Sequence, residues 1–472
     1  MHSVLKRVIY SIFAEALNSK SVYMSNNSSP VELGSKNIWP LLIQYAVPSV
    51  IAMTSTSLYN ITGSIFIGQG VGALAIAGLA VTFPLMNLGA AFGSLVGVGA
   101  STLMSLRLGQ RDYESANRIL GNVFVLNLII GLAYTVVILI FMNPILHFFG
   151  ASDASLPFAR DYMVIISLGN IFTHMFLGLN ALLRATGKPK ISMLTTICSV
   201  IINIGLTALF IFVFKWGIRG AALATVISQV LMLLWQIAIF SDKREFIHLQ
   251  RDTFRLKKKI VKNSLVIGLS PFLMNAAASL VVIFVNRQLA ANGGDMAIGA
   301  YGIINRLVML FAMIVMGLNQ GMQPIVGYNY GAGNIERVKS AFGKTLLLAF
   351  CVLALGYIVG KTFPTQIAEL FTNDEELIGL ASSGLIIVMT FFPLVSVQMV
   401  VSNLFQSIGK SGPAIFLSLT RQVLFLLPLM IILPDLYGVN GVWYSMRTAD
   451  LMSFCVALTL LIIQYRRLVS SS

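Results

Sequence analysis

Charged residues are scarce in this chain. Asp, Glu, Lys and Arg make up 10% of its 472 residues, whereas 57% are hydrophobic and the mean hydropathy is +0.85. A soluble domain carries about 25% charged residues, so this chain has too few to cover a surface that faces water. The scarcity excludes an ordinary soluble protein and indicates a chain that lies in a lipid bilayer.

Cysteine and the motifs of common enzymes are also sparse. The three cysteines, Cys198, Cys351 and Cys455, fall in apolar segments without metal-ligand spacing, so neither a disulfide framework nor a metal site is predicted. The chain contains no Gly-x-x-x-x-Gly-Lys-Ser/Thr loop, which argues against ATP hydrolysis. Acidic and histidine side chains do not cluster as an integral-membrane enzyme would need. The sequence therefore predicts no catalytic residues and no cofactor.

Long apolar runs are abundant, and runs of about 20 residues are typical of membrane-spanning helices. The twelve runs predicted to span the membrane are residues 40–67, 74–106, 119–141, 161–184, 191–214, 220–240, 261–290, 297–327, 341–363, 378–407, 414–433 and 441–464. Two of them, 74–106 and 297–327, exceed the need of a bilayer and are expected to tilt or project. The predicted fold class is an all-α integral membrane protein.

The second half of the chain repeats the first at a nearly constant offset in residue number. Ala75-Ile76 recurs as Ala297-Ile298 and Gly187-Lys188 as Gly409-Lys410, an offset of 222; late in each half the offset is 221, since Gly217 recurs as Gly438. Six helices per half bring each half back to its starting side, so the two lobes are expected to be parallel and to rock about a central cleft. The predicted domains are a cytoplasmic tail (1–37), a first lobe (38–240), a basic cytoplasmic linker (241–259), a second lobe (260–465) and a C-terminal tail (466–472).

The basic residues are unevenly distributed. The net charge is +15, and with a cytoplasmic N-terminus 24 Lys and Arg fall in cytoplasmic segments against five in outer ones. This asymmetry is the positive-inside rule, so both termini are expected in the cytoplasm and the charge is not a nucleic-acid site. Arg184 is counted among the cytoplasmic charges. Within the polar tail, Met24 opens an alternative start.

Several stretches carry a resemblance to a known family. They are Tyr59–Gly68, Gly109–Ala116, Asn180–Pro189, Gln320–Gly331 and Asn403–Lys410. In their order across the twelve helices and two halves they resemble the multidrug and toxic compound extrusion (MATE) family, and most of all its bacterial multidrug-efflux branch.

The resemblance implies six plus six helices in a V-shaped pair of lobes. It also implies a secondary active antiporter of the bacterial plasma membrane, which exports amphipathic or cationic small molecules against entering sodium ions or protons. We expect a monomer surrounded by membrane lipids. An alternative is a flippase for a lipid-linked saccharide, but its phosphate would require a cluster of basic side chains in the cavity, and the embedded basic residues are few and scattered. A passive channel is disfavoured by the two-lobed repeat.

The chain departs from the family at two positions. Many members have an aspartate five residues before the glycine that matches Gly68, where this chain has Gly63. Many also have Asn-x-x-x-Asp in the fifth helix, where this chain has Asn203 followed by Thr207. Neither glycine nor threonine takes up a proton, so proton coupling through the aspartates of the first lobe is in doubt.

Polar residues in apolar helices are the candidates for the substrate and ion pathway, because buried polar groups need partners in hydrocarbon. They are Asn60, Gly63, His174, Asn180, Asn203 and Thr207 in the first lobe, and Asn275, Asn305, Arg306, Gln398, Asn403 and Gln406 in the second. His174 is either a hydrogen-bonded packing residue or a proton carrier. The amides and Thr207 either offer oxygens to sodium or tie helices together.

Asp450 is the acid that falls clearly within a helix. Arg447, three residues earlier, and Arg421 in the preceding helix are its candidate partners. The pair is either a fixed ion pair or a coupling site, and the repeat places Asp450 opposite Ser228.

Overall fold

The structure is a computed structural model that describes residues 31–470, without the side chains of Leu58, Asn60, Arg251 and residues 464–470. Every regular element in this range is a helix. The first half contains α3 (Glu32–Ser35), α4 (Ile38–Gly70), α5 (Ala73–Gly109), α6 (Tyr113–Ile140), α7 (Met142–Phe148), α8 (Leu156–Ala185), α9 (Pro189–Ala208), the π-helical η1 (Leu209–Val213) and α10 (Gly217–Ser241). The second half contains η2 (Arg251–Phe254), α11 (Lys258–Gly331), α12 (Ile335–Thr362), α13 (Pro364–Glu369), α14 (Glu375–Val388), η3 (Met389–Phe391), α15 (Phe392–Ser407), α16 (Ser411–Leu419), the π-helical η4 (Thr420–Leu426), α17 (Leu427–Tyr437) and α18 (Val439–Ser470). Met24 and most of the predicted tail lie outside the described residues.

The predicted twelve crossings are present. Eleven helical stretches of the described chain are long and apolar enough to cross a membrane. One of them, α11, has 74 residues and turns at Gly294, whose φ of 61° is a conformation that glycine adopts without strain. This turn divides α11 into two crossings, which correspond to the predicted runs 261–290 and 297–327.

Two helices begin earlier than the apolar runs indicated. The runs start at residues 119 and 341, whereas α6 begins at Tyr113 and α12 at Ile335. Each start is capped by the preceding side chain: Asp112 accepts a hydrogen bond from the backbone N–H of Ser115, and Asn334 accepts one from that of Arg337. Polar first turns therefore concealed these helix starts from a search for apolar residues.

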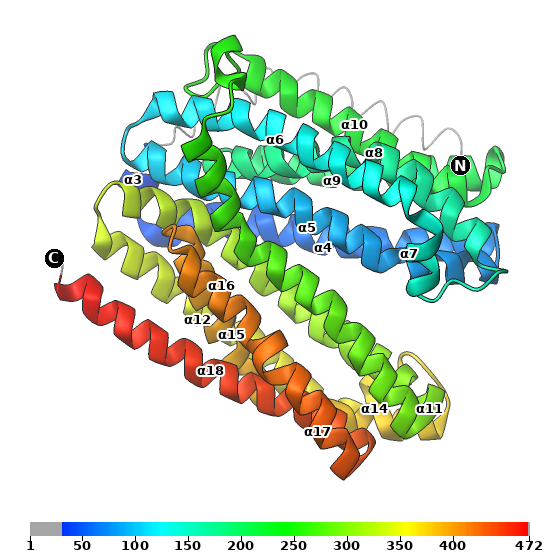
Figure 1. Cartoon of the computed structure of the whole chain (residues 1–472). Helices are drawn as coiled ribbons and strands as arrows, with labels where there is room; N and C mark the ends of the chain where they lie inside the picture. The colour runs from blue at the N-terminus through cyan, green and yellow to red at the C-terminus, as the bar shows by residue number, and fades with distance from the viewer. Residues whose placement is uncertain (1–30, 471–472) are drawn as a thin grey trace.

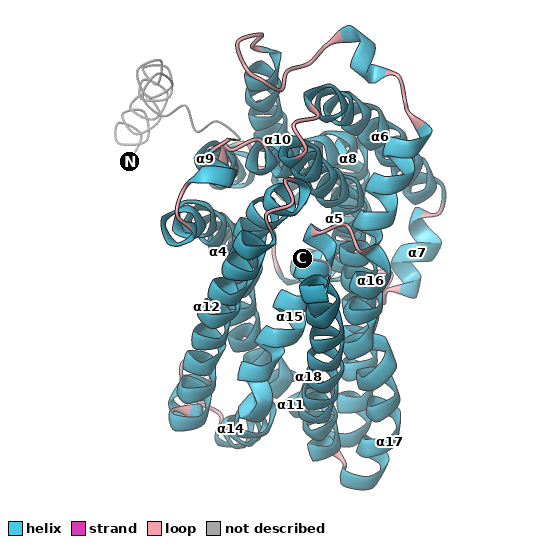
Figure 2. Ribbon diagram, turned by 90° about the vertical axis from the view of Figure 1, so that its left-hand side faces the viewer, coloured by secondary structure: helices cyan, strands magenta, loops and turns pink. Residues whose placement is uncertain are grey.

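The helices form two lobes. Figure 1 shows α4 to α10 on one side and α11 to α18 on the other, meeting near α3 and diverging towards α7, α14 and α17. Figure 2 shows the same helices turned by 90°, with α7 at mid-height along the right-hand edge and α17 at the bottom. We call the end where the lobes meet the basic end, since it carries Lys36, Arg107, Lys188, Lys257 and Lys344. The V-shaped pair of lobes is the predicted architecture.

Glycines bring the lobes into backbone contact near the basic end. A Cβ added to Gly109 of α5 would overlap the carbonyl oxygen of Tyr328, and one added to Gly331 of α11 would overlap that of Leu106. The repeat exchanges these two contacts, so the duplication in the sequence is a two-fold relation in space. Gly99 approaches the backbone of Ser264 in the same way. We call this contact the glycine seam.

Short segments that precede each lobe dock on the other lobe. The carbonyl oxygen of Leu33 in α3 accepts a hydrogen bond from Asn329 Nδ2 of α11 at 2.9 Å, and that of Lys36 accepts one from Arg337 Nη2 of α12 at 2.6 Å. In the linker, Asn122 of α6 donates to the carbonyl oxygen of Thr253 and accepts from the backbone N–H of Lys257. At the basic end, the two lobes are thus joined by these hydrogen bonds as well as by the packing along the glycine seam.

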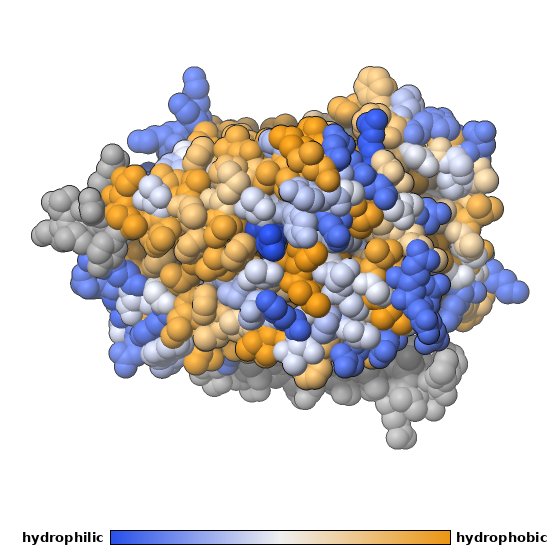
Figure 3. Space-filling view, turned by 90° about the horizontal axis from the view of Figure 1, so that it is seen from below, coloured by the Kyte–Doolittle hydropathy of each residue, from blue (hydrophilic) through white to orange (hydrophobic). Residues whose placement is uncertain are grey.

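The outer surface of the bundle is apolar. Figure 3 shows hydrophobic residues over much of the face seen from below, with hydrophilic residues near the middle of the face as well as along its margins. Large exposed side chains include Leu132 in α6, Leu234 in α10, Leu355 in α12 and Ile432 in α17. Such extensive apolar exposure suits a surface in contact with lipid.

Candidate functional site

A cavity of about 240 Å³ lies within the first lobe. Its walls come from α4, α5, α8, α9 and α10, and Gln320 of α11 adds one side chain from the second lobe. The polar lining residues are Thr56, Tyr59, Ser94, Asn180, Arg184, Thr196, Ser199, Asn203, Thr225, Ser228, Gln229 and Gln320. Met53, Val98, Phe176 and Leu177 supply apolar contacts. A concave site with apolar walls and a few directed polar groups is typical of small-molecule sites.

One polar network joins three helices at this cavity. Thr225 of α10 lies 3.1 Å from the hydroxyl of Tyr59 in α4 and accepts a hydrogen bond from Asn203 Nδ2 of α9 at 3.1 Å. Thr207 donates to Asn203 Oδ1 at 3.3 Å. The predicted pair Asn203 and Thr207 is therefore brought together, with Asn203 on the cavity wall. Tyr59 and Thr225 were not singled out from the sequence, because hydroxyls are common in apolar helices.

A second network lies at the other part of the cavity, where α8 ends. Asn180 Nδ2 donates to Thr195 Oγ1 and Thr196 Oγ1 of α9, both at 3.1 Å. Asn180 Oδ1 accepts from Arg184 Nη1 at 2.6 Å, and Arg184 Nη1 also lies 3.0 Å from Ser192 Oγ. The predicted candidate Asn180 thus holds a guanidinium.

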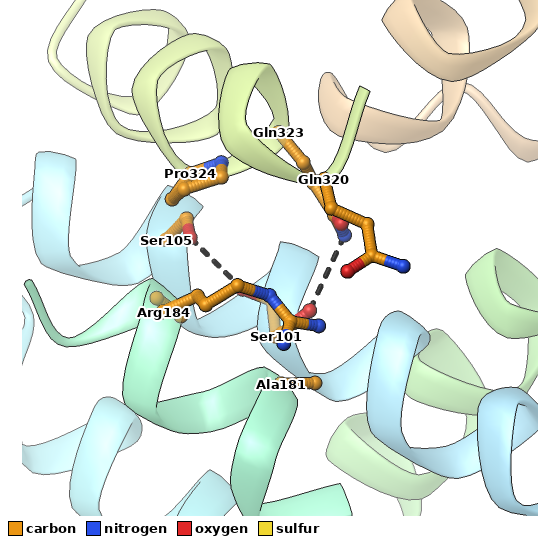
Figure 4. Close-up of a pocket in the computed structure, with 8 residues that line it drawn as sticks. Ser101, Ser105, Ala181, Arg184, Gln320, Gln323 and Pro324 are labelled. Atoms are coloured by element: carbon orange, nitrogen blue, oxygen red, sulfur yellow. Dashed lines mark hydrogen bonds between the residues drawn. The ribbon is translucent and has the colours of Figure 1, made fainter. Parts of the chain in front are cut away.

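Arg184 was expected among the charges on the cytoplasmic side, and the structure shows that its side chain turns into the protein. It belongs to the last turn of α8, and its side chain lines both the cavity and a smaller pocket that reaches the second lobe. Figure 4 shows Arg184 entering this pocket beside Ser101 and Ser105 of α5 and Gln320, Gln323 and Pro324 of α11. In the sequence, an arginine at a helix end indicates a surface charge. The direction of its side chain is visible only in the fold.

The remaining candidates of the first lobe stand apart from the cavity. His174 is buried between α5 and α8, where its Nε2 lies 2.8 Å from the carbonyl oxygen of Gly89 and 3.0 Å from Asn170 Nδ2. Through Nε2, His174 links α8 to the backbone of α5. Gly63 of α4 has open space where a Cβ would stand, and it lines neither pocket. The side chain of Asn60 lies outside the described part.

The six candidates of the second lobe line neither of these two pockets. Asn275 donates to the carbonyl oxygen of Pro271 in its own helix at 2.9 Å, and Gln398 of α15 donates to that of Leu417 in α16 at 3.0 Å. Asn403 accepts from Ser407, while the exposed Arg306 lies over the ring of Phe371. Asn305 is partly buried and Gln406 is buried.

Asp450 of α18 pairs with Arg421 of η4. Arg421 Nε lies 2.6 Å from Asp450 Oδ1, and the carboxylate is almost completely buried. Arg447 is not its partner; this guanidinium lies 5.1 Å from the ring centroid of Tyr444 instead. The structure therefore decides between the two candidate partners.

The repeat relates this ion pair to the cavity of the first lobe. The offset of 222 places Ser199 at the position of Arg421 and Ser228 at that of Asp450, and the offset of 221 seen in the last helices would place Gln229 there instead. All three of these residues line the cavity. One lobe thus has an ion pair where the other has a cavity wall of neutral polar groups.

Comparisons with known proteins agree with this architecture. The MatE family model matches residues 48–209 and 267–432. The multidrug export protein MepA of Staphylococcus haemolyticus (strain JCSC1435) is 30% identical over 427 residues, which cover 90% of this chain and 93% of that protein.

Two solved structures, one of MATE in a bent conformation and one of a multidrug resistance MATE family transporter in an outward-facing conformation, have TM-scores of 0.89 and 0.88. Each is 24% identical, and the match covers 94% of this chain and 99% of that one. The family model and the relative, with the fold that these structures share, show that the chain belongs to the MatE family of multidrug and toxic compound extrusion transporters.

Proposed function

We propose that this protein is a secondary active exporter of amphipathic or cationic small molecules, and that it works by alternating access between its two lobes. The observation that carries the proposal is the cavity of the first lobe, which lies beside the glycine seam in a duplicated, membrane-spanning bundle. Parallel repeats that meet at one end can exchange which side is open by rocking. The name of the relative MepA, a multidrug export protein, supports the same class of cargo.

The proposed orientation places the basic end and both termini in the cytoplasm of a bacterial cell, with the helices in the plasma membrane. The basic residues at this end support it through the positive-inside rule. The seam then closes the cytoplasmic side, and the lobes diverge towards the outside. We propose that the conformation described here is the outward-facing one and that the working unit is a monomer surrounded by lipid.

The cavity suits a partly apolar cargo. Met53, Tyr59 and Phe176 offer an adaptable thioether and aromatic faces, while Asn180, Asn203 and Thr225 offer directed hydrogen bonds. A lipid-linked saccharide, by contrast, carries phosphate and would need several cations. Among the residues that line the two pockets Arg184 is the one basic side chain, which favours the exporter over the flippase.

We propose that the coupling ion, sodium or a proton, acts at the Asp450–Arg421 pair of the second lobe. Asp450 is the one buried acidic residue in the described chain, and no carboxylate lines the first-lobe cavity. An ionisable pair that is costly to hold in hydrocarbon is a natural place for an ion to act.

The test is transport by the purified protein in sealed lipid vesicles. A fluorescent rhodamine is added, both as the zwitterionic free acid and as the cationic methyl ester, and proton and sodium gradients are imposed separately. We expect dye to move against its own concentration gradient under one of the two ion gradients and to stop when that gradient is collapsed. Dye movement under neither gradient, or simple equilibration that ignores both, would contradict the proposal.

A further inference from the structure

The cavity of the first lobe contains a positive charge without a negative partner. No carboxylate in the described chain forms an ion pair with Arg184, although Lys188, four residues later, has one at 2.6 Å in Glu245. The two hydrogen bonds of Arg184 both come from Nη1 and go to neutral oxygens of Asn180 and Ser192. Among the described residues its Nε and Nη2 have no acceptor. These two nitrogens form the edge of the guanidinium that can bind both oxygens of one carboxylate.

The position of this charge makes it available to a ligand. Arg184 lines the 240 Å³ cavity and also the adjoining pocket between Ser101 and Gln320, so it stands where the cavity meets the second lobe (Figure 4). Asn180 and Ser192 hold Nη1 from one side. A guanidinium whose orientation is already set by neutral hydrogen bonds loses less conformational freedom when it binds an anion.

The charge is specific to the first lobe. Residue 184 corresponds to residue 406 in the repeat, which is the neutral, buried Gln406. The packing of a helix end in this scaffold therefore does not itself require arginine. An unpaired cation in a low-dielectric site is costly, and an anionic ligand would offset that cost.

We propose that Arg184 binds the carboxylate of an amphipathic, carboxylate-bearing substrate whose apolar or cationic body lies along Tyr59 and Phe176. Resting on the proposed export function, this assigns a substrate class to the cavity: zwitterions and organic acids with an aromatic body, ahead of pure cations. The guanidinium fork matches a carboxylate in a bidentate manner. A pure cation would find no carboxylate on the lining and would approach Arg184 against charge repulsion.

The test compares two dyes that differ only at this group, a rhodamine free acid and its methyl ester. Binding of each to the purified full-length protein is measured by equilibrium dialysis, and transport is measured in vesicles. We expect the ratio of acid to ester affinity to fall at least about tenfold in Arg184→Gln, because a charge-assisted hydrogen bond is lost, and to fall less in Arg184→Lys, which keeps the charge but not the bidentate fork. Arg118→Gln, at an exposed pair with Glu114, is the matched control and should leave the ratio unchanged.

An unchanged acid-to-ester ratio in a folded Arg184→Gln protein overturns the inference and leaves Arg184 as a structural tie between α8 and α9. If Arg184→Gln does not fold, the wild type and Arg184→Lys decide: a wild type that binds the ester as tightly as the acid overturns the inference as well. If the wild type prefers the acid in dialysis but moves neither dye under any gradient, the site stands and the export function fails.

Discussion

At the scale of residues, the two lobes differ in chemistry at related positions. The second lobe carries Asp450 paired with Arg421, whereas the first carries Ser199 with Ser228 or Gln229 on a cavity wall. At the two positions of the first lobe where the family resemblance led us to expect an acid, this chain has Gly63 and Thr207. Substrate binding and ion coupling are therefore assigned to different lobes in our account.

The ion pair gives the first prediction. Asp450→Asn leaves Arg421 without its carboxylate, so we expect a loss of about 3 kcal/mol in the free energy of unfolding together with loss of gradient-driven transport. Unfolding in detergent and dye transport in vesicles measure the two effects. Asp435→Asn, at an exposed carboxylate of α17, is the control and should change neither.

A double variant distinguishes a role of the ion pair in ion coupling from a role in stability alone. Asp450→Asn combined with Arg421→Gln removes both charges, and we expect it to recover much of the lost stability while transport stays uncoupled from the ion gradient. Full gradient-driven transport by this double variant would show that the pair only holds α18 against η4.

Thr225 gives the second prediction. Thr225→Val keeps the shape of the side chain but removes the partner of both Tyr59 and Asn203. We expect a loss of about 1–3 kcal/mol in stability and weaker dye binding, measured by thermal unfolding and equilibrium dialysis. Thr345→Val serves as the control, because the hydroxyl of Thr345 donates to the carbonyl oxygen of Ala341 in its own helix and, within the described residues, links no other helix. Equal effects of the two substitutions on dye binding would contradict a role for the Thr225 network in the site.

At the scale of elements, the glycine seam is the contact that closes one side. Gly331→Ala adds a methyl group against the carbonyl oxygen of Leu106, so we expect the lobes to separate locally at a cost of about 1–3 kcal/mol. Hydrogen exchange should rise in residues 99–109 of α5. Gly343→Ala places its methyl group in open space on α12 and should leave that exchange unchanged. A Gly331→Ala protein whose seam exchanges no faster than the wild type would contradict the close backbone approach.

The helices were largely predictable from the sequence, because a bilayer demands long apolar runs. The short helices α7 and α13 were missed, since seven and six residues carry too weak a pattern. They occupy related positions after the third helix of each lobe, so the repeat held a signal that apolar runs did not. The docking of α3 on Asn329 and Arg337 depends on contacts between residues far apart in the chain and has no local signature.

The site was predictable only in part, for a physical reason. Asn180, Asn203 and Asp450 are conspicuous as polar groups in apolar helices, and two of them line the cavity. His174 was equally conspicuous, but it lines neither pocket, and its Nε2 contacts the carbonyl oxygen of Gly89. Arg184 was hidden because charge at a helix end is ordinary, and only the direction of the side chain distinguishes an inward from an outward arginine.

At the scale of the whole molecule, a symmetric scaffold carries asymmetric chemistry. The seam contacts of Gly109 and Gly331 exchange under the repeat, which is what two lobes need in order to rock about a shared contact. The largest cluster of buried hydrophobic side chains also spans both lobes, from Leu41 in α4 to Met322 in α11. Alternating access then requires that the end opposite the seam close when the seam opens.

The most direct measurement of this claim is a distance between the two lobes at that opposite end. Phe148, the last residue of α7, and Leu370, which follows α13, are equivalent in the repeat, and their side chains are 80% and 82% exposed. Each is replaced by cysteine and spin-labelled in protein whose three native cysteines are changed to alanine. The distance distribution is recorded in vesicles with and without substrate and the coupling gradient. We predict a long distance at rest and a second, shorter population when substrate and gradient are both present; one unchanged distribution, in protein that transports dye, would contradict alternating access.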